Sequence, residues 1–183
     1  MKRSAYVLNG PNLNLLGTRE PHIYGTTTLA ELRKQCEGHA AKKGITISFY
    51  QSNHEGVLVD LIQEARTKAD AIIFNPAGYS FHSIPILDAL KTFEGPIFEV
   101  HISNIHRRDE HHRHSITSTA ATGVICGLGP QGYIAAIDAV AAMGLRPEVV
   151  IFKFAIAGVT ASEHQRGYRR SLTLLSPPWR RQR

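Results

Sequence analysis

Cysteine is scarce in this chain, which narrows the classes of protein that it can encode. Only two of the 183 residues are cysteines, Cys36 and Cys126. Two thiols do not make the framework of a disulfide-rich secreted domain, and neither stands near a metal-ligand partner at a useful spacing. We therefore expect buried thiols in a reducing compartment, hence a cytoplasmic protein, with a nucleophilic cysteine as the minor alternative.

Long apolar runs and a secretory leader are also missing. No apolar run reaches the roughly 20 residues that span a bilayer, and the N-terminus lacks a signal-peptide pattern, so we expect no membrane association. Apolar residues make up 43% of the chain and charged residues 20%, which is typical of soluble globular proteins. A chain of 183 residues is expected to form one domain with its own core.

Positive charge is concentrated near the C-terminus. Residues 1–145 hold 13 Lys and Arg against 13 Asp and Glu, whereas residues 146–183 hold 8 against 2. We therefore expect a neutral domain over 1–145 and a basic extension of unknown role over 146–183. A packed extra element, a flexible appendage and a spurious extension stay open for it. No nucleic-acid-binding module accompanies the basic segment, so we expect no nucleic-acid partner.

Short β-rich runs alternate with helical patterns along the first 145 residues. This alternation predicts an α/β fold, in which a parallel sheet is covered by helices on both faces. Five strands favour a flavodoxin-like sheet with the order 2-1-3-4-5. The strands are predicted at 5–8, 45–50, 71–75, 96–101 and 123–126, and the helices at 29–43, 55–68, 84–92 and 131–143.

Polar side chains follow the predicted strands where ligands bind in such folds, beyond the carboxyl ends. The loop after the first strand is the richest. An Arg five residues before a Tyr can lie against the phenol and favour its anion, which would make Tyr24 a base near neutral pH. The polar residues at strand ends are Asn9, Asn12, Arg19 and Tyr24, then Gln51, Ser52, Asn53 and His54, then Asn75, and finally His101 and Ser103.

Glu99 and His101 stand two apart on a predicted strand, so they share one face of the sheet. A carboxylate beside an imidazole favours the protonated ring and fixes its orientation, as a general acid requires. A surface pair on an edge strand is the alternative. The flanking apolar run predicts a central strand, which favours the functional interpretation.

Two loops, the polar one after residue 75 and the glycine-rich one at 127–132, can have a purely structural role or a functional one. Asn75 can close a turn, with Ser83 capping the next helix, and can also hold a substrate hydroxyl. Residues 127–132, Gly-Leu-Gly-Pro-Gln-Gly, match the dinucleotide fingerprint. They follow the last strand, however, and Pro130 removes a backbone donor, so we favour tight packing of strand against helix over dinucleotide binding.

Four histidines, His106, His111, His112 and His114, lie among three arginines. A zinc site would need neutral ligands and nearby carboxylates, which the arginines oppose. We expect this segment to face an anion or another subunit.

Over residues 4–143 the chain resembles the type II 3-dehydroquinate dehydratases. Five motifs in register carry the resemblance: Asn9–Gly17, Arg19 with Tyr24–Gly25, Gln51–Gly56, Glu99–Asn104 and Ala121–Gly129. The resemblance implies loss of water from 3-dehydroquinate to give 3-dehydroshikimate, without metal or organic cofactor. It also implies trimers that assemble into a dodecamer.

Site roles follow from the resemblance, position by position. Tyr24 would take the proton alpha to the ketone, Arg19 would lower its pKa and close with it as a lid, and Asn12 would hold the water that stabilises the enolate. His101, oriented by Glu99, would protonate the departing hydroxyl. The substrate-binding residues implied are Asn75 at that hydroxyl, the amides of Ile102 and Ser103 at the carboxylate, and Asp88 from a neighbouring subunit.

Two positions depart from the family pattern. Phe81 takes the place of a substrate-binding His, and His112 takes the place of an Arg. We expect His82 and Arg113, each one residue later, to reach the same ring hydroxyls through shifted backbones. The departures also leave open a lyase of altered substrate preference or weak activity. A nucleotide- or phosphate-binding module is the alternative from another class.

Overall fold

The computed structural model describes residues 3–19 and 25–143. Tyr24 and the predicted extension over 146–183 lie outside the described residues. Within the described ranges, no helix has the length and apolar character needed to cross a membrane.

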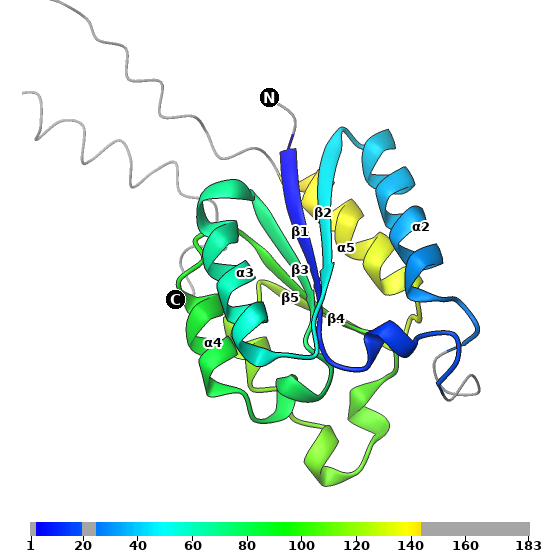
Figure 1. Cartoon of the computed structure of the whole chain (residues 1–183), viewed down its shortest axis with the longest axis vertical. Helices are drawn as coiled ribbons and strands as arrows, with labels where there is room; N and C mark the ends of the chain where they lie inside the picture. The colour runs from blue at the N-terminus through cyan, green and yellow to red at the C-terminus, as the bar shows by residue number, and fades with distance from the viewer. Residues whose placement is uncertain (1–2, 20–24, 144–183) are drawn as a thin grey trace, which may run out of the picture. The chain divides into compact units, whose positions relative to one another are not determined.

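Five parallel strands form the sheet, in the order β2-β1-β3-β4-β5, as predicted. The register pairs Asn9 with both Gln51 and Asn75, so the carboxyl ends of β1, β2 and β3 are level. His101 at the end of β4 pairs with Cys126 at the end of β5. The strands, shown in Figure 1, are β1 (Arg3–Asn9), β2 (Ile45–Gln51), β3 (Ala71–Asn75), β4 (Ile97–His101) and β5 (Gly123–Cys126).

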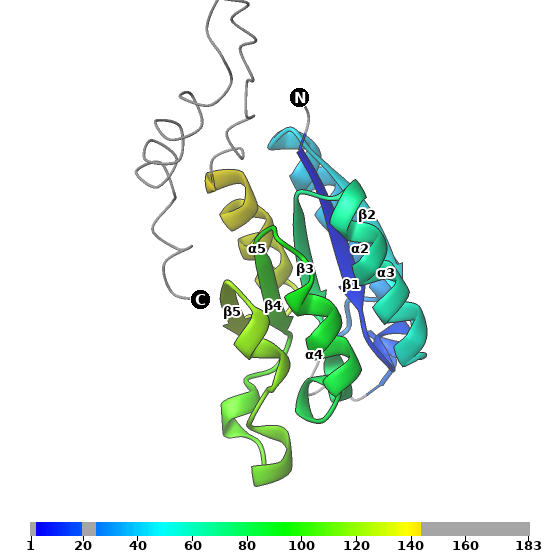
Figure 2. The same cartoon turned by 90° about the vertical axis from the view of Figure 1, so that its left-hand side faces the viewer.

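Helices cover both faces of the sheet (Figures 1 and 2). The helices are α2 (Leu29–Lys42), α3 (Glu55–Lys68), α4 (Ile84–Lys91) and α5 (Gln131–Ala142). Alternate residues of β1 point to opposite faces: Val7 packs in the core beneath α2 and α5, and Leu8 in the core beneath α3 and α4. Burial on both faces explains the continuous apolar runs from which the strands were predicted.

Local signals place the helix ends. Thr28 forms a capping box with Glu31 at the start of α2, and Ser83 accepts a hydrogen bond from the Ile86 amide, which confirms the cap predicted for Ser83. At the start of α5, a Cβ on Gly132 would lie 3.1 Å from Val100 Cγ1. This close approach supports the interpretation of residues 127–132 as tight packing of a helix against a strand.

Candidate active site

A pocket of about 190 Å³ opens at the carboxyl end of the sheet. Segments that follow β1, β3 and β4 line it, as the polar residues at those strand ends predicted. Six of the predicted site residues lie in its wall: Asn12, Arg19, Asn75, His101, Ile102 and Ser103.

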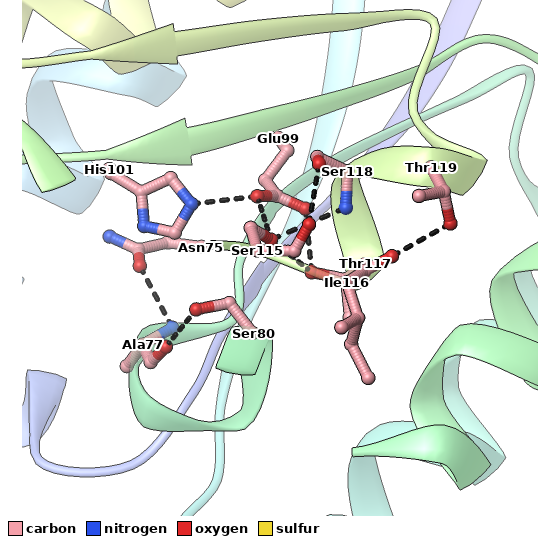
Figure 3. Close-up of polar contacts among 10 residues, drawn as sticks. All are labelled: Asn75, Ala77, Ser80, Glu99, His101, Ser115, Ile116, Thr117, Ser118 and Thr119. Atoms are coloured by element: carbon pink, nitrogen blue, oxygen red, sulfur yellow. Dashed lines mark hydrogen bonds and ion pairs between the residues drawn. The ribbon is translucent and has the colours of Figure 1, made fainter. Parts of the chain in front are cut away.

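His101 and Glu99 form a buried pair on β4. The Nε2 atom of His101 lies 2.7 Å from Glu99 Oε1, and the two residues are 4% and 1% exposed. Because Nε2 is bonded to the carboxylate, the opposite ring nitrogen, Nδ1, is the one left for a ligand in the pocket (Figure 3).

Two hydroxyls complete the environment of Glu99. Ser115 Oγ donates to Oε1 and Thr117 Oγ1 donates to Oε2, each at 2.6 Å (Figure 3). With His101, these bonds give both carboxylate oxygens partners in a site closed to water. Sequence reasoning missed both residues. The available signal was a Ser-x-Thr spacing just before β5, the strand that pairs with β4.

Residues after β2 support the pocket rather than line it. The Asn53 side chain accepts hydrogen bonds from the Asn12 amide and from Gln51 Nε2, both at 3.0 Å. Asn12 has φ of +66°, a left-handed conformation that Asn tolerates better than most residues. The end of β2 therefore holds the loop that carries Asn12.

The backbones after β1 and β3 also touch directly. The Gly10 amide donates to Asn75 O at 2.8 Å, and a Cβ on Gly10 would lie only 2.3 Å from Pro76 O. Only glycine fits at this position without moving one of the two loops.

Arg108 brings a guanidinium to the pocket beside Ser103. Its Nη2 donates to Ser103 Oγ at 2.8 Å, and both residues line the cavity. The sequence singled out Ser103, and it placed Arg108 only in the basic segment that was expected to face an anion or another subunit. The wall near the predicted carboxylate site therefore carries positive charge.

Among the described residues, no three His, Cys, Asp or Glu side chains gather in a group that could hold a metal ion. The histidine segment 106–114 instead follows β4 as two short 3-10 helices, Ile105–Arg107 and Glu110–His112.

Residues 3–141 match the family model described as Dehydroquinase class II. The chain belongs to the class II dehydroquinase family. It is 53% identical to a 3-dehydroquinate dehydratase of Caulobacter vibrioides, over 76% of this chain and 95% of that protein. It is 51% identical to a catabolic 3-dehydroquinase of Emericella nidulans, over 77% and 92%. The type II dehydroquinase structure from Propionibacterium acnes has a TM-score of 0.76 and 40% identity, over 78% and 99%.

Two positions at which this dehydroquinase departs from the family pattern meet in the pocket wall. The rings of Phe81 and His112 are 5.2 Å apart, edge to face, and both residues line the cavity. His112 Nδ1 lies 2.8 Å from each carboxylate oxygen of Asp109, and this hydrogen bond holds the pKa of Asp109 below its usual value.

Three residues expected to bind the substrate of a dehydroquinase do not line this pocket. His82 is exposed, as is Arg113, whose guanidinium donates to Arg108 O at 3.0 Å. Asp88 is exposed on α4, 3.6 Å from Lys91 Nζ. Phe81 and His112 occupy the wall where His82 and Arg113 were expected.

Proposed function

We propose that the chain removes water from 3-dehydroquinate to give 3-dehydroshikimate through an enolate intermediate. The observation that carries this proposal is the buried Glu99–His101 pair facing a pocket shared with Asn12 and Arg19, in a chain half-identical to proteins named 3-dehydroquinate dehydratase. Elimination beta to a ketone needs a base, an enolate stabiliser and an acid for the leaving hydroxyl.

His101 is the acid in this scheme. Its Nε2 is committed to Glu99, so Nδ1 would deliver the proton to the departing hydroxyl. The carboxylate that orients this ring already has two hydroxyl donors and therefore needs no reorganisation during the transfer. Asn75, in the same wall, would bind the hydroxyl as it leaves.

We assign the base to Tyr24, as phenolate, with Arg19 lowering its pKa and closing over the substrate. Arg19 lines the pocket, which supports this assignment. Asn12 would hold the water that stabilises the enolate oxygen. The amides of Ile102 and Ser103 would bind the substrate carboxylate, and Arg108 would add charge there.

Product formation tests the proposal directly, because the conjugated enone absorbs in the ultraviolet. The wild type is expected to raise the absorbance of a 3-dehydroquinate solution, and His101→Ala to slow that rise about 10²-fold to 10⁴-fold. His39→Ala is a matched control, since His39 pairs with Asp138 away from the pocket. A wild type that leaves dehydroquinate unchanged would rule the function out.

The Phe81–His112 contact favours a second candidate, a lyase with altered preference for ring hydroxyls. An apolar ring stands in the wall where the family pattern has a hydrogen-bonding residue, and losing such a partner costs about 1–3 kcal/mol. The KM for dehydroquinate should then exceed that for an analogue lacking one ring hydroxyl. A lower KM for dehydroquinate than for every deoxy analogue removes this candidate.

We also propose that the chain assembles into trimers and then a dodecamer, with Asp88 reaching a neighbouring copy's pocket. Asp88 does not line its own pocket and its side chain is 67% exposed. Ile84, one turn earlier on the same face of α4, is an apolar residue 56% exposed. Light scattering should give twelve times the chain mass, and Asp88→Ala should raise KM without changing that mass. A fully active monomer would contradict this assembly.

A cytoplasmic location remains our proposal for the protein. It is supported by two free cysteines, of which buried Cys36 has a pKa raised to about 12 by desolvation. Fractionation of cells that make the protein tests it; recovery in a secreted fraction would contradict it.

A further inference from the structure

Three buried polar side chains form a connected chain beneath the pocket, and the proposed reaction gives only one of them a role. Asn75 Nδ2 donates to the Tyr133 hydroxyl at 2.9 Å, and that hydroxyl donates to Asn9 Oδ1 at 2.7 Å. Tyr133 and Asn9 are fully buried, and Asn75 is 3% exposed. Residues from α5, β1 and β3 therefore meet at one point under the pocket floor.

Backbone groups at both ends fix the direction of these hydrogen bonds. The Ala77 amide can only donate, and it donates to Asn75 Oδ1 at 3.2 Å, which turns Asn75 Nδ2 towards Tyr133. At the far end, Asn9 Nδ2 donates to the carbonyl of Tyr50 at 2.8 Å, which leaves Asn9 Oδ1 as the acceptor for Tyr133. Only this orientation of the two amides forms all four of these hydrogen bonds.

The Tyr133 hydroxyl is well suited to this link. Burial raises its pKa well above the ordinary value for a phenol, so the hydroxyl stays protonated and can accept from Asn75 while donating to Asn9. If the Asn75 amide rotated by 180°, its nitrogen would face the Ala77 amide, and two hydrogen bonds would be lost in a buried site.

We propose that Tyr133, with Asn9, is a positioning residue that locks the Asn75 amide as a hydrogen-bond donor to the departing hydroxyl. Asn75 lines the pocket, its Oδ1 is occupied by Ala77, and one hydrogen of Nδ2 is used by Tyr133. The second hydrogen of Asn75 Nδ2 is then available to donate a hydrogen bond to a ligand in the pocket. This inference rests on the proposed dehydration, because it names the group that holds the leaving hydroxyl in that reaction.

Tyr133→Phe tests this role, since it removes one oxygen and keeps the ring. We expect kcat for dehydroquinate to fall about 10-fold, with KM changed less than about 2-fold, because the lost donor acts on the leaving group. Tyr6→Phe is the matched control. Tyr6 is 4% exposed, lies in the core on the other face of the sheet and bonds Glu64, so its loss should leave kcat unchanged.

A double-mutant cycle separates positioning from general stability. In an Asn75→Ala background, Tyr133→Phe should have no further effect on kcat. Equal losses in both backgrounds, or an unchanged kcat in the single variant, would overturn the inference. If Tyr133→Phe does not fold, Asn9→Ala removes the acceptor of the hydroxyl and enters the same cycle. An inactive wild type would refute the proposed function itself, whereas an active wild type with an unaffected Tyr133→Phe refutes only this role.

Discussion

Glu99 shows how much of this site depends on groups that never meet a ligand. Its carboxyl group is almost wholly removed from water, and it accepts hydrogen bonds from His101, Ser115 and Thr117. A buried carboxylate is costly unless every oxygen has a donor. The two hydroxyls therefore decide how firmly the carboxylate can hold the imidazole.

Thr117→Val removes one of those donors without changing the shape of the side chain. We expect kcat for dehydroquinate to fall about 5-fold to 10-fold, because a hydrogen bond to a charged group is worth about 1.5–3 kcal/mol and part of the loss reaches His101. Thr119→Val is the control. Within the described part of the chain, the Thr119 hydroxyl donates to the nearby carbonyl of Ile116 and not to Glu99 (Figure 3), so this variant should keep wild-type kcat. Equal effects of the two substitutions would contradict the role of Thr117.

Ala77 carries backbone strain that glycine would relieve. Its φ is +51°, in the left-handed region, which costs a residue with a Cβ about 1–2 kcal/mol. We expect Ala77→Gly to stabilise the protein by about 0.5–1 kcal/mol in urea unfolding. Ala121→Gly, at φ of −78°, should instead destabilise it. A loss of stability in Ala77→Gly would show that the strain is absent.

At the scale of elements, sequence patterns located each strand and α-helix that the structure describes to within two residues at each end, but none of the short 3-10 helices. The strand at 5–8 extends to Arg3–Asn9, because pairing with β2 continues beyond the apolar run. Apolar periodicity identifies the side chains that must be buried, but strand length depends on a partner that is distant in sequence.

The site divides in the same way. Residues at strand ends could be predicted, because parallel topology brings those ends together. The role of Tyr133, which lies 124 residues from Asn9, could not be predicted. Its buried position on α5 gives the same apolar pattern whether or not the hydroxyl has a partner. Phe81 and His112 were recognised as substitutions, yet their contact with each other required coordinates.

A charged cluster joins α2 to α5. Asp138 pairs with His39 Nε2 at 2.8 Å and Lys43 Nζ at 2.9 Å, and the His39 hydrogen bond is the main cause that lowers the Asp138 pKa from 3.8. A carboxyl group with a depressed folded pKa stabilises the fold above its unfolded pKa. That stability is lost as the pH falls through the folded value.

Asp138→Asn should therefore lower the melting temperature at pH values above about 4, and the difference from wild type should vanish as the solution is acidified. Thermal unfolding followed by circular dichroism between about pH 3 and pH 7 would measure it. A difference that stays constant across this range would show that Asp138 acts through packing rather than through charge.

At the scale of the whole molecule, the family match ends at residue 141, and the last described helix ends at Ala142. We expect a chain ended after residue 145 to keep kcat and KM for dehydroquinate within about 2-fold of the full chain, since no residue assigned to the site lies beyond it. Steady-state absorbance assays of the two chains compare them. A large loss of activity on truncation would assign the basic segment a part in catalysis.

The absence of a side chain at Gly10 affects the whole active site and not only its own turn. Glycine at this position allows the loops that carry Asn12 and Asn75 to touch, since a methyl group there would collide with the carbonyl of Pro76. Gly10→Ala would therefore move the loop with Asn12 away from the loop with Asn75. Every residue assigned to the reaction would still be present. Such a variant would keep all of its reactive groups and have no catalytic turnover.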